Sequence, residues 1–101
     1  MIILNTTFVV TRLLCDEFVK WLNEVYVPAA LATGIFTTHR IARVLKNEQH
    51  EVESLACELC CESLSEAVRW HDQTAVLLRD DMTARWGENA MFFTTYLRTV
   101  S

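Results

Sequence analysis

Residues 2–10 read IILNTTFVV, and this stretch decides the fold. Successive side chains of an extended strand point to opposite sides, so the stretch divides into two faces. One face carries Ile2, Leu4, Thr6, Phe8 and Val10, and the other carries Ile3, Asn5, Thr7 and Val9. Both faces are largely apolar, so a sheet built on this strand has apolar groups to bury on each of its sides.

The composition predicts a single compact domain over residues 1–101. The chain is 51% hydrophobic and contains two glycines and one proline, which excludes disordered and linker-like sequences. A length of 101 residues is typical of one domain and leaves no room for a second.

The charge balance excludes several classes of partner. The formal net charge is −4, whereas binding to nucleic acid needs clustered basic side chains. The longest uncharged stretch, Val25–Thr38, is shorter than the roughly 20 apolar residues that a membrane helix needs. Met1–Val10 carries no positive side chain of the kind that begins a secretory signal. We therefore expect neither nucleic acid nor a membrane as partner, and a cytoplasmic chain that begins at Met1.

After Thr11 the apolar period changes from two to between three and four residues. The apolar positions are Leu14, Phe18, Trp21, Leu22, Val25 and Ala29. Charged residues lie between them, so the pattern predicts an amphipathic helix. Pro28 lacks a backbone N–H and is expected to kink or end this helix, and Thr33–Gly34 provides a stop.

Two further strands and a hairpin are predicted in the middle of the chain. Residues 36–46 and 52–61 have β-like composition, and Asn47–His50 is short enough to join them as antiparallel strands.

A second helix begins at the capping box Ser63-Leu64-Ser65-Glu66. Its apolar stripe reads Leu64, Val68, Ala75, Leu78 and Met82, with His71 in the same phase. Gly87 ends the helix after Trp86, and residues 90–100 form the last strand.

The order of elements is strand, helix, strand, strand, helix, strand. Right-handed crossovers then place both helices on one face of a four-stranded antiparallel sheet. The sequence therefore predicts an α+β fold of the ferredoxin-like βαββαβ type.

The face of this sheet that the helices leave open is predicted to be apolar. It receives Ser54, Ala56, Glu58 and Cys60 from the third strand, Ile3 and Val9 from the first and, in our interpretation, Phe92 and Tyr96 from the fourth. Exposing five large apolar groups would forgo roughly 10 kcal/mol, comparable with the stability of a whole domain. We therefore predict a homodimer in which two sheets pack face to face as a dimeric α+β barrel. The alternative is a modestly apolar face that stays exposed.

Polar side chains on the same face are the candidates for a ligand site. On the second strand His39 and Arg43 share one phase and Arg40 and Ala42 share the other, and the sequence does not decide which pair faces the ligand. The candidate ligand-binding residues are Asn5, Thr7, His39, Arg43, Glu58 and Tyr96. In one interpretation a small organic molecule binds between the sheets, with Glu58 accepting protons or pairing with an arginine and Asn5 orienting the ligand. In the other, an internal Glu–Arg pair fixes the strand register or the dimer interface.

The cysteines and histidines give no catalytic or metal motif. Cys15, Cys57, Cys60 and Cys61 are predicted to be reduced thiols. Cys57 and Cys60 match C-x-x-C, but residues three apart in a strand point to opposite faces, so we expect no metal and no cofactor.

His71 is interpreted as a packed core histidine, and Asp72 is expected to point elsewhere on the helix, so no Ser-His-Asp arrangement is predicted. The tryptophans Trp21, Trp70 and Trp86 are expected to cover the sheet.

Several short motifs resemble a family of short bacterial proteins classed as a domain of unknown function. They are Met1-Ile2-Ile3-x-Asn5-x-Thr7, the helix with Trp21 and Pro28, Thr33-Gly34-x-Phe36, Arg43-Val44-Leu45 and Phe93-x-Thr95. The resemblance implies a ferredoxin-like fold of the dimeric α+β barrel type and self-association, and it carries over no catalytic residues.

Three functions remain open at this point. The first is a dimeric module that binds a small organic molecule, and the second is a cofactor-independent monooxygenase or isomerase with Glu58 or a histidine as base. The third is a structural or interaction module without a ligand. The wider superfamily includes haem-degrading monooxygenases, to which Asn5, Trp70 and His71 invite comparison. Adjacent helical residues such as Trp70 and His71 do not face the same pocket, however.

Overall fold

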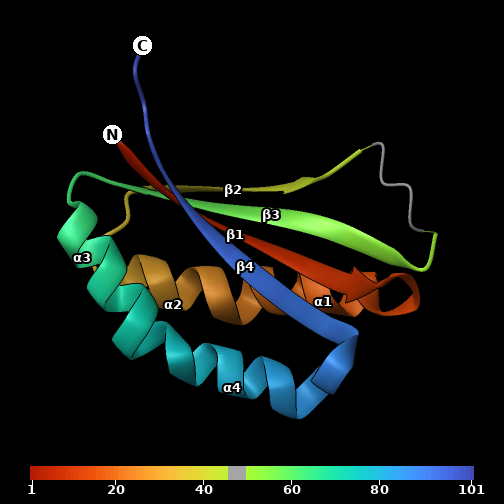
Figure 1. Cartoon of the computed structure of the whole chain (residues 1–101). Helices are drawn as coiled ribbons and strands as arrows, with labels where there is room; N and C mark the ends of the chain where they lie inside the picture. The colour runs from red at the N-terminus through yellow and green to blue at the C-terminus, as the bar shows by residue number, and fades with distance from the viewer. Residues whose placement is uncertain (46–49) are drawn as a thin grey trace.

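The computed structural model describes residues 1–45 and 50–101. Within them, β1 (Ile2–Thr11) lies inside a four-stranded antiparallel sheet with the order β2-β3-β1-β4. Its neighbours are β3 (Val52–Cys61) and β4 (Ala90–Arg98), and β2 (Thr38–Arg43) forms the edge next to β3. The order of elements is that of the predicted βαββαβ fold (Figure 1).

Two helical rods cover one side of the sheet and leave the other side open (Figure 1). The first rod joins α1 (Cys15–Trp21), a π-helical turn (Leu22–Tyr26) and α2 (Val27–Ala32). The second joins α3 (Leu64–Arg69), a π-helical turn (Trp70–Thr74) and α4 (Ala75–Trp86). Short 3₁₀ turns at Arg12–Leu14 and Gly87–Asn89 connect the rods to β1 and β4.

Pro28 does not end the first rod. It lies in the first turn of α2, directly after the π-helical turn. The wider turn moves the preceding carbonyls away from the proline ring, whose clash with the carbonyl four residues earlier would otherwise break the helix. The rod therefore continues to Ala32, and Gly34, with a φ of +77°, ends it as predicted.

The second rod starts as predicted, but its buried stripe differs from the prediction. The Ser63 hydroxyl accepts a hydrogen bond from the Glu66 N–H at 3.2 Å. Leu64, predicted to be buried, is exposed in the first turn. Ala75 and Met82 are buried as predicted, and Ala67, Trp70 and Trp86 are buried with them. The π-helical turn between Trp70 and Ala75 puts the buried positions before it out of phase with those after it.

The core fills the space between the sheet and the rods. The Phe8 ring of β1 lies 5.2 Å from Phe18 and 5.5 Å from Tyr26. Trp21, Trp70 and Trp86 are all buried in this layer, which confirms that they cover the sheet. Burying such rings supplies most of the free energy that holds the rods on the sheet.

The second strand is shorter than predicted, because β2 spans Thr38–Arg43 instead of residues 36–46. Phe36 precedes it and is buried in the core. β2 and β3 pair in antiparallel fashion as expected, whereas residues 46–49, with most of the predicted Asn47–His50 turn, lie outside the described residues.

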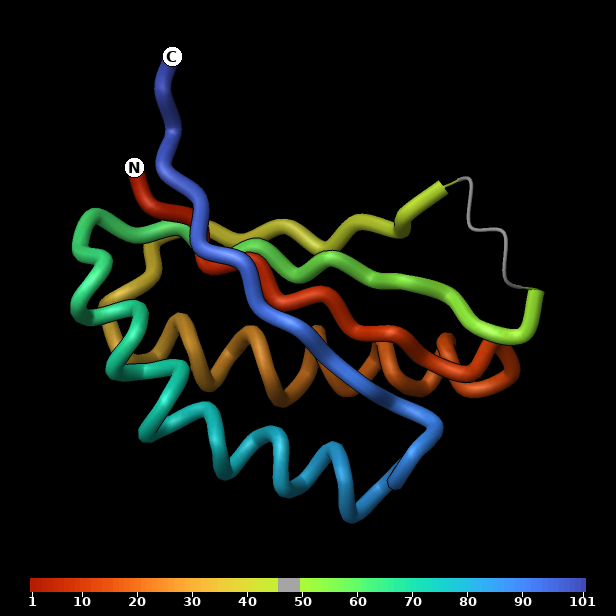
Figure 2. Tube along the Cα trace, viewed as in Figure 1, coloured from red at the N-terminus to blue at the C-terminus, as the bar shows by residue number. Residues whose placement is uncertain are grey.

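The two ends of the chain lie side by side at one end of the sheet (Figure 2). The Thr99 N–H donates to the Met1 carbonyl at 3.0 Å, which continues the pairing of β4 with β1. None of the helices in residues 1–45 and 50–101 has the length and apolarity that a membrane crossing requires.

Candidate functional site

The open face of the sheet carries exposed apolar side chains. Met91, Phe93 and Leu97 of β4 are 65%, 55% and 41% exposed. They lie opposite Val9, Thr7 and Ile3 of β1, so all six side chains share the face that the rods do not cover. The predicted apolar character of this face is therefore correct.

A polar row crosses the open face in register. Arg40, Glu58, Asn5 and Thr95 lie opposite one another on β2, β3, β1 and β4. The Arg40 Nη2 and Nε atoms lie 2.8 and 2.9 Å from Glu58 Oε1. The Arg40 side chain is 72% exposed and that of Glu58 is 20% exposed, so the pair sits at the surface of this face.

Asn5 is next to this ion pair and carries a buried polar atom. Its Oδ1 is buried and has no hydrogen-bond partner among the described residues. Thr7, two residues along the same face, is buried between Ala56 of β3 and Phe93 of β4. Asn5, Thr7 and Glu58 therefore lie together, as the sequence predicted.

Three other candidates, His39, Arg43 and Tyr96, lie on the helix side of the sheet. His39 and Arg43 are opposite Leu59 and Leu55, which face the helices, and Arg43 pairs with Glu53 at 3.1 Å. Ile41 explains this phase, because the large apolar residue of β2 packs against the core and turns its neighbours Arg40 and Ala42 to the open face. The sequence did not decide between Arg40 and Arg43, and the structure places Arg40 on the open face.

Tyr96 and Phe92 were assigned to the open face, and both assignments are wrong. They lie opposite Leu4 and Phe8, on the helix side. Ala90, buried opposite Val10, sets the phase of β4, and every second residue follows it. Phe93, and not Phe92, lies on the open face.

His71 has the partner that the sequence did not predict. Its Nδ1 lies 2.8 Å from Asp72 Oδ1 and its Nε2 lies 2.7 Å from the Thr94 hydroxyl of β4. The Arg79 Nη2 donates to the His71 carbonyl at 2.8 Å, and the Tyr96 ring lies 6.1 Å from the imidazole. The expectation that Asp72 points elsewhere is therefore wrong. This cluster fastens the second rod to β4 on the helix side, so the sheet separates His71 and Trp70 from Asn5.

Three of the four cysteines lie in β3, on both of its faces, and Cys15 begins α1. Cys57 is buried on the helix side, whereas Cys60 lies opposite Ile3 on the open face, as the C-x-x-C spacing predicted for a strand. Burial, with the nearby charge of Glu58, raises the pKa of the Cys57 thiol to about 12, and burial raises that of Cys15 to about 11. The thiols stay protonated at neutral pH, the inert form of a cysteine. Within residues 1–45 and 50–101 no cluster of three His, Cys, Asp or Glu residues has the geometry of a metal site.

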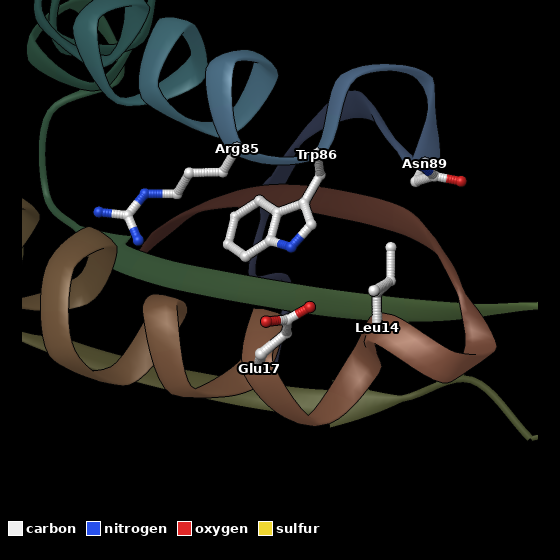
Figure 3. Close-up of a pocket in the computed structure, with 5 residues that line it drawn as sticks. All are labelled: Leu14, Glu17, Arg85, Trp86 and Asn89. Carbon is white, nitrogen blue, oxygen red and sulfur yellow. The ribbon is translucent and has the colours of Figure 1, made fainter.

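A hollow lies between α1 and α4, away from the open face of the sheet. Figure 3 shows Trp86 between the two helices, with Leu14 and Glu17 below it and Arg85 and Asn89 beside it. Its volume is about 320 Å³. The Arg85 Nε already donates to Asp81 at 3.1 Å, and Asp81 also accepts from Trp21 Nε1 at 2.9 Å. These hydrogen bonds lower the pKa of Asp81, the bond from Trp21 most, and the bond from Trp21 joins α1 to α4.

Comparison with known proteins identifies the family and the fold. The model of a family described as a domain of unknown function, DUF4286, matches residues 1–100, and no curated protein matches the chain. A dimeric ferredoxin-like protein from an uncultured marine organism has a TM-score of 0.66 at 17% identity over 100% of this chain and 96% of its own. A de novo designed protein with a ferredoxin fold has a TM-score of 0.56 at 14% identity, over 100% of this chain and 88% of its own. The fold is therefore ferredoxin-like, and the chain belongs to the DUF4286 family.

Proposed function

We propose that the protein is a homodimer whose two sheets pack face to face and hold a small organic molecule between them. The observation that carries this proposal is the open face, on which Met91, Phe93 and Leu97 lie beside the polar row of Arg40, Glu58 and Asn5. An exposed apolar patch around a few polar groups is typical of an interface or a binding site.

A second copy is the occupant that this face fits best. Covering the exposed parts of the three β4 side chains contributes on the order of 4 kcal/mol from each copy. Each copy brings both Arg40 and Glu58, so a two-fold axis places an equal number of positive and negative charges on the two surfaces. The similar marine protein, which matches along the whole chain, is described as dimeric.

The polar row supports a ligand within this interface. Two packed sheets remove the row from water, and enclosed polar groups need hydrogen-bond partners. Asn5 Oδ1 already lacks one among the described residues, and Glu58 and Thr7 lie beside it. A small molecule with a polar group and an apolar body matches both parts of the face.

Sedimentation velocity tests the interface. We expect the substitution Ala56→Lys, which places a charge in the middle of the open face opposite Thr7 and Ala42, to halve the mass of the wild-type assembly. The matched control is Leu13→Lys, because Leu13 is 93% exposed but lies beyond the end of β1, and it should leave the mass unchanged. A monomeric wild type at micromolar concentration, or an unchanged mass for Ala56→Lys, overturns the proposed dimer.

An NMR titration with benzyl alcohol tests the ligand. We expect shifts in the amide resonances of Asn5, Thr7 and Glu58, and none in those of Phe18 and Tyr26 in the helix layer. Glu58→Gln should weaken binding while the variant stays folded. If saturating benzyl alcohol shifts no resonance of the open face, the protein is a structural module instead. The same conclusion follows if Glu58→Gln changes stability but not binding.

A further inference from the structure

The outer edges of β2 and β4 differ in length and charge. β2 has six residues, among them His39, Arg40 and Arg43, and charges of this kind discourage pairing with another strand. β4 has nine residues, and its one charged residue is Arg98 at the end. A long, uncharged edge strand is a template for a further strand.

The main-chain groups on the outer edge of β4 can be assigned from one hydrogen bond. Thr99 donates to Met1 at 3.0 Å, so the residues of β4 that bond to β1 follow in steps of two from Thr99. They are Leu97, Thr95, Phe93 and Met91. Phe92, Thr94 and Tyr96 therefore direct their N–H and C=O groups outward. Within the described residues β4 pairs with β1 alone, so these groups have no strand partner there.

We infer that this edge pairs in antiparallel fashion with β4 of a second copy, with Thr94 on the two-fold axis. The axis places Phe92 opposite the partner's Tyr96 and Met91 opposite the partner's Leu97. The outward-facing main-chain groups of Phe92, Thr94 and Tyr96 then meet outward-facing groups of the partner, because only residues of the same parity pair. Aromatic and apolar side chains in such positions stabilise a sheet.

The charges of β4 are compatible with this pairing. Arg98 lies opposite the partner's Ala90, so the two Arg98 side chains lie at opposite ends of the paired strands, roughly 27 Å apart at a rise of about 3.4 Å per residue. The result is one continuous sheet of two chains with the four helical rods on one side. The open faces of the two chains form one surface in this sheet. The face-to-face packing of the proposed function and the edge pairing of β4 can therefore act together, and they then assemble four copies.

Amide hydrogen exchange tests whether the outward N–H groups of β4 are hydrogen-bonded. We expect the amides of Phe92, Thr94 and Tyr96 to be protected in the wild-type protein. Phe93 and Thr95, which bond to β1, are protected with or without a partner and serve as the internal control. Fast exchange at all three outward positions beside slow exchange at Phe93 and Thr95 overturns the pairing.

Two variants at one position separate this inference from the face-to-face dimer. Thr94→Pro removes an outward N–H and should halve the wild-type mass, because proline at the outer side of an edge strand keeps the pairing with β1. Thr94→Val loses the same hydroxyl contact with His71 but keeps the N–H, and should assemble as the wild type does. An unchanged mass for Thr94→Pro overturns the edge pairing and leaves the face-to-face dimer standing. A halved mass for Thr94→Pro with no effect of Ala56→Lys supports the edge pairing and overturns the face-to-face dimer.

Discussion

The two faces of β1 come from one alternating stretch but meet different surroundings. On the helix side Ile2, Leu4 and Phe8 are buried under the two rods within a single chain. On the open side Ile3, Asn5 and Val9 are partly exposed, although two of them are as apolar as their neighbours. The difference shows that alternation fixes which side chains share a face, whereas the elements packed on that face decide how much they contribute to stability.

Truncation of one side chain on each face gives the largest expected contrast. Phe8→Ala should lower the free energy of unfolding by about 3–5 kcal/mol, because it leaves a cavity beside Phe18 and Tyr26. Val9→Ala should cost roughly 1 kcal/mol or less when both are measured by urea denaturation in the Ala56→Lys background. Equal losses at the two positions would contradict the comparison.

The thiol on the helix face should make the fold sensitive to alkaline pH. The folded chain holds the proton of Cys57 up to a pKa of about 12, whereas the unfolded thiol releases it near 9.0. Stability is therefore present below pH 9 and is lost as the pH rises toward 12, by about 2 kcal/mol at pH 10.5. Urea denaturation from pH 8 to 10.5 should show a shallower loss for Cys57→Ala than for the wild type.

The matched control for this experiment is Cys60→Ala, which removes a thiol from the open face of the same strand. Identical slopes for the wild type and Cys57→Ala would mean that this buried thiol does not link folding to pH.

The smallest effect on stability is expected for the ion pair of the open face. Arg40→Ala should change the free energy of unfolding by less than about 1 kcal/mol, because the arginine is largely exposed and water screens the pair. The same variant should weaken the benzyl alcohol shifts at Asn5 if the polar row binds the probe. A loss of several kcal/mol would instead assign the pair a structural role.

The sequence predicted the faces of β1 and β3 because their buried sides repeat apolar residues with a period of two, interrupted in β1 only by Thr6 and continued in β3 by two cysteines. β4 lacks such a pattern, since Phe92-Phe93 and Thr94-Thr95 are doublets that fit either phase equally well. The burial of Ala90 and the contacts of Thr94 and Tyr96 with His71 place these even-numbered residues on the helix side. Tyr96 was assigned to the wrong face because the doublets leave the phase open.

The helices show a second limit of periodicity. Each rod contains a π-helical turn, and one such turn moves all later residues around the helix axis. A single stripe counted at 3.6 residues per turn fits Ala75 and Met82 after the turn of the second rod, but before the turn it selects the exposed Leu64 and misses Trp70. The hydrogen bonds of His71 to Asp72 and Thr94 depend on this local geometry.

The pairing of the first strand with the last has a consequence for the speed of folding. β1 is internal to the sheet, but one of its edges is satisfied only by β4, so the sheet is completed by contacts of high sequence separation. Contacts of this kind slow folding relative to local ones, because the intervening chain must first be ordered. Until β4 arrives, a strand that is apolar on both faces exposes an open edge, which makes partly folded chains prone to aggregate.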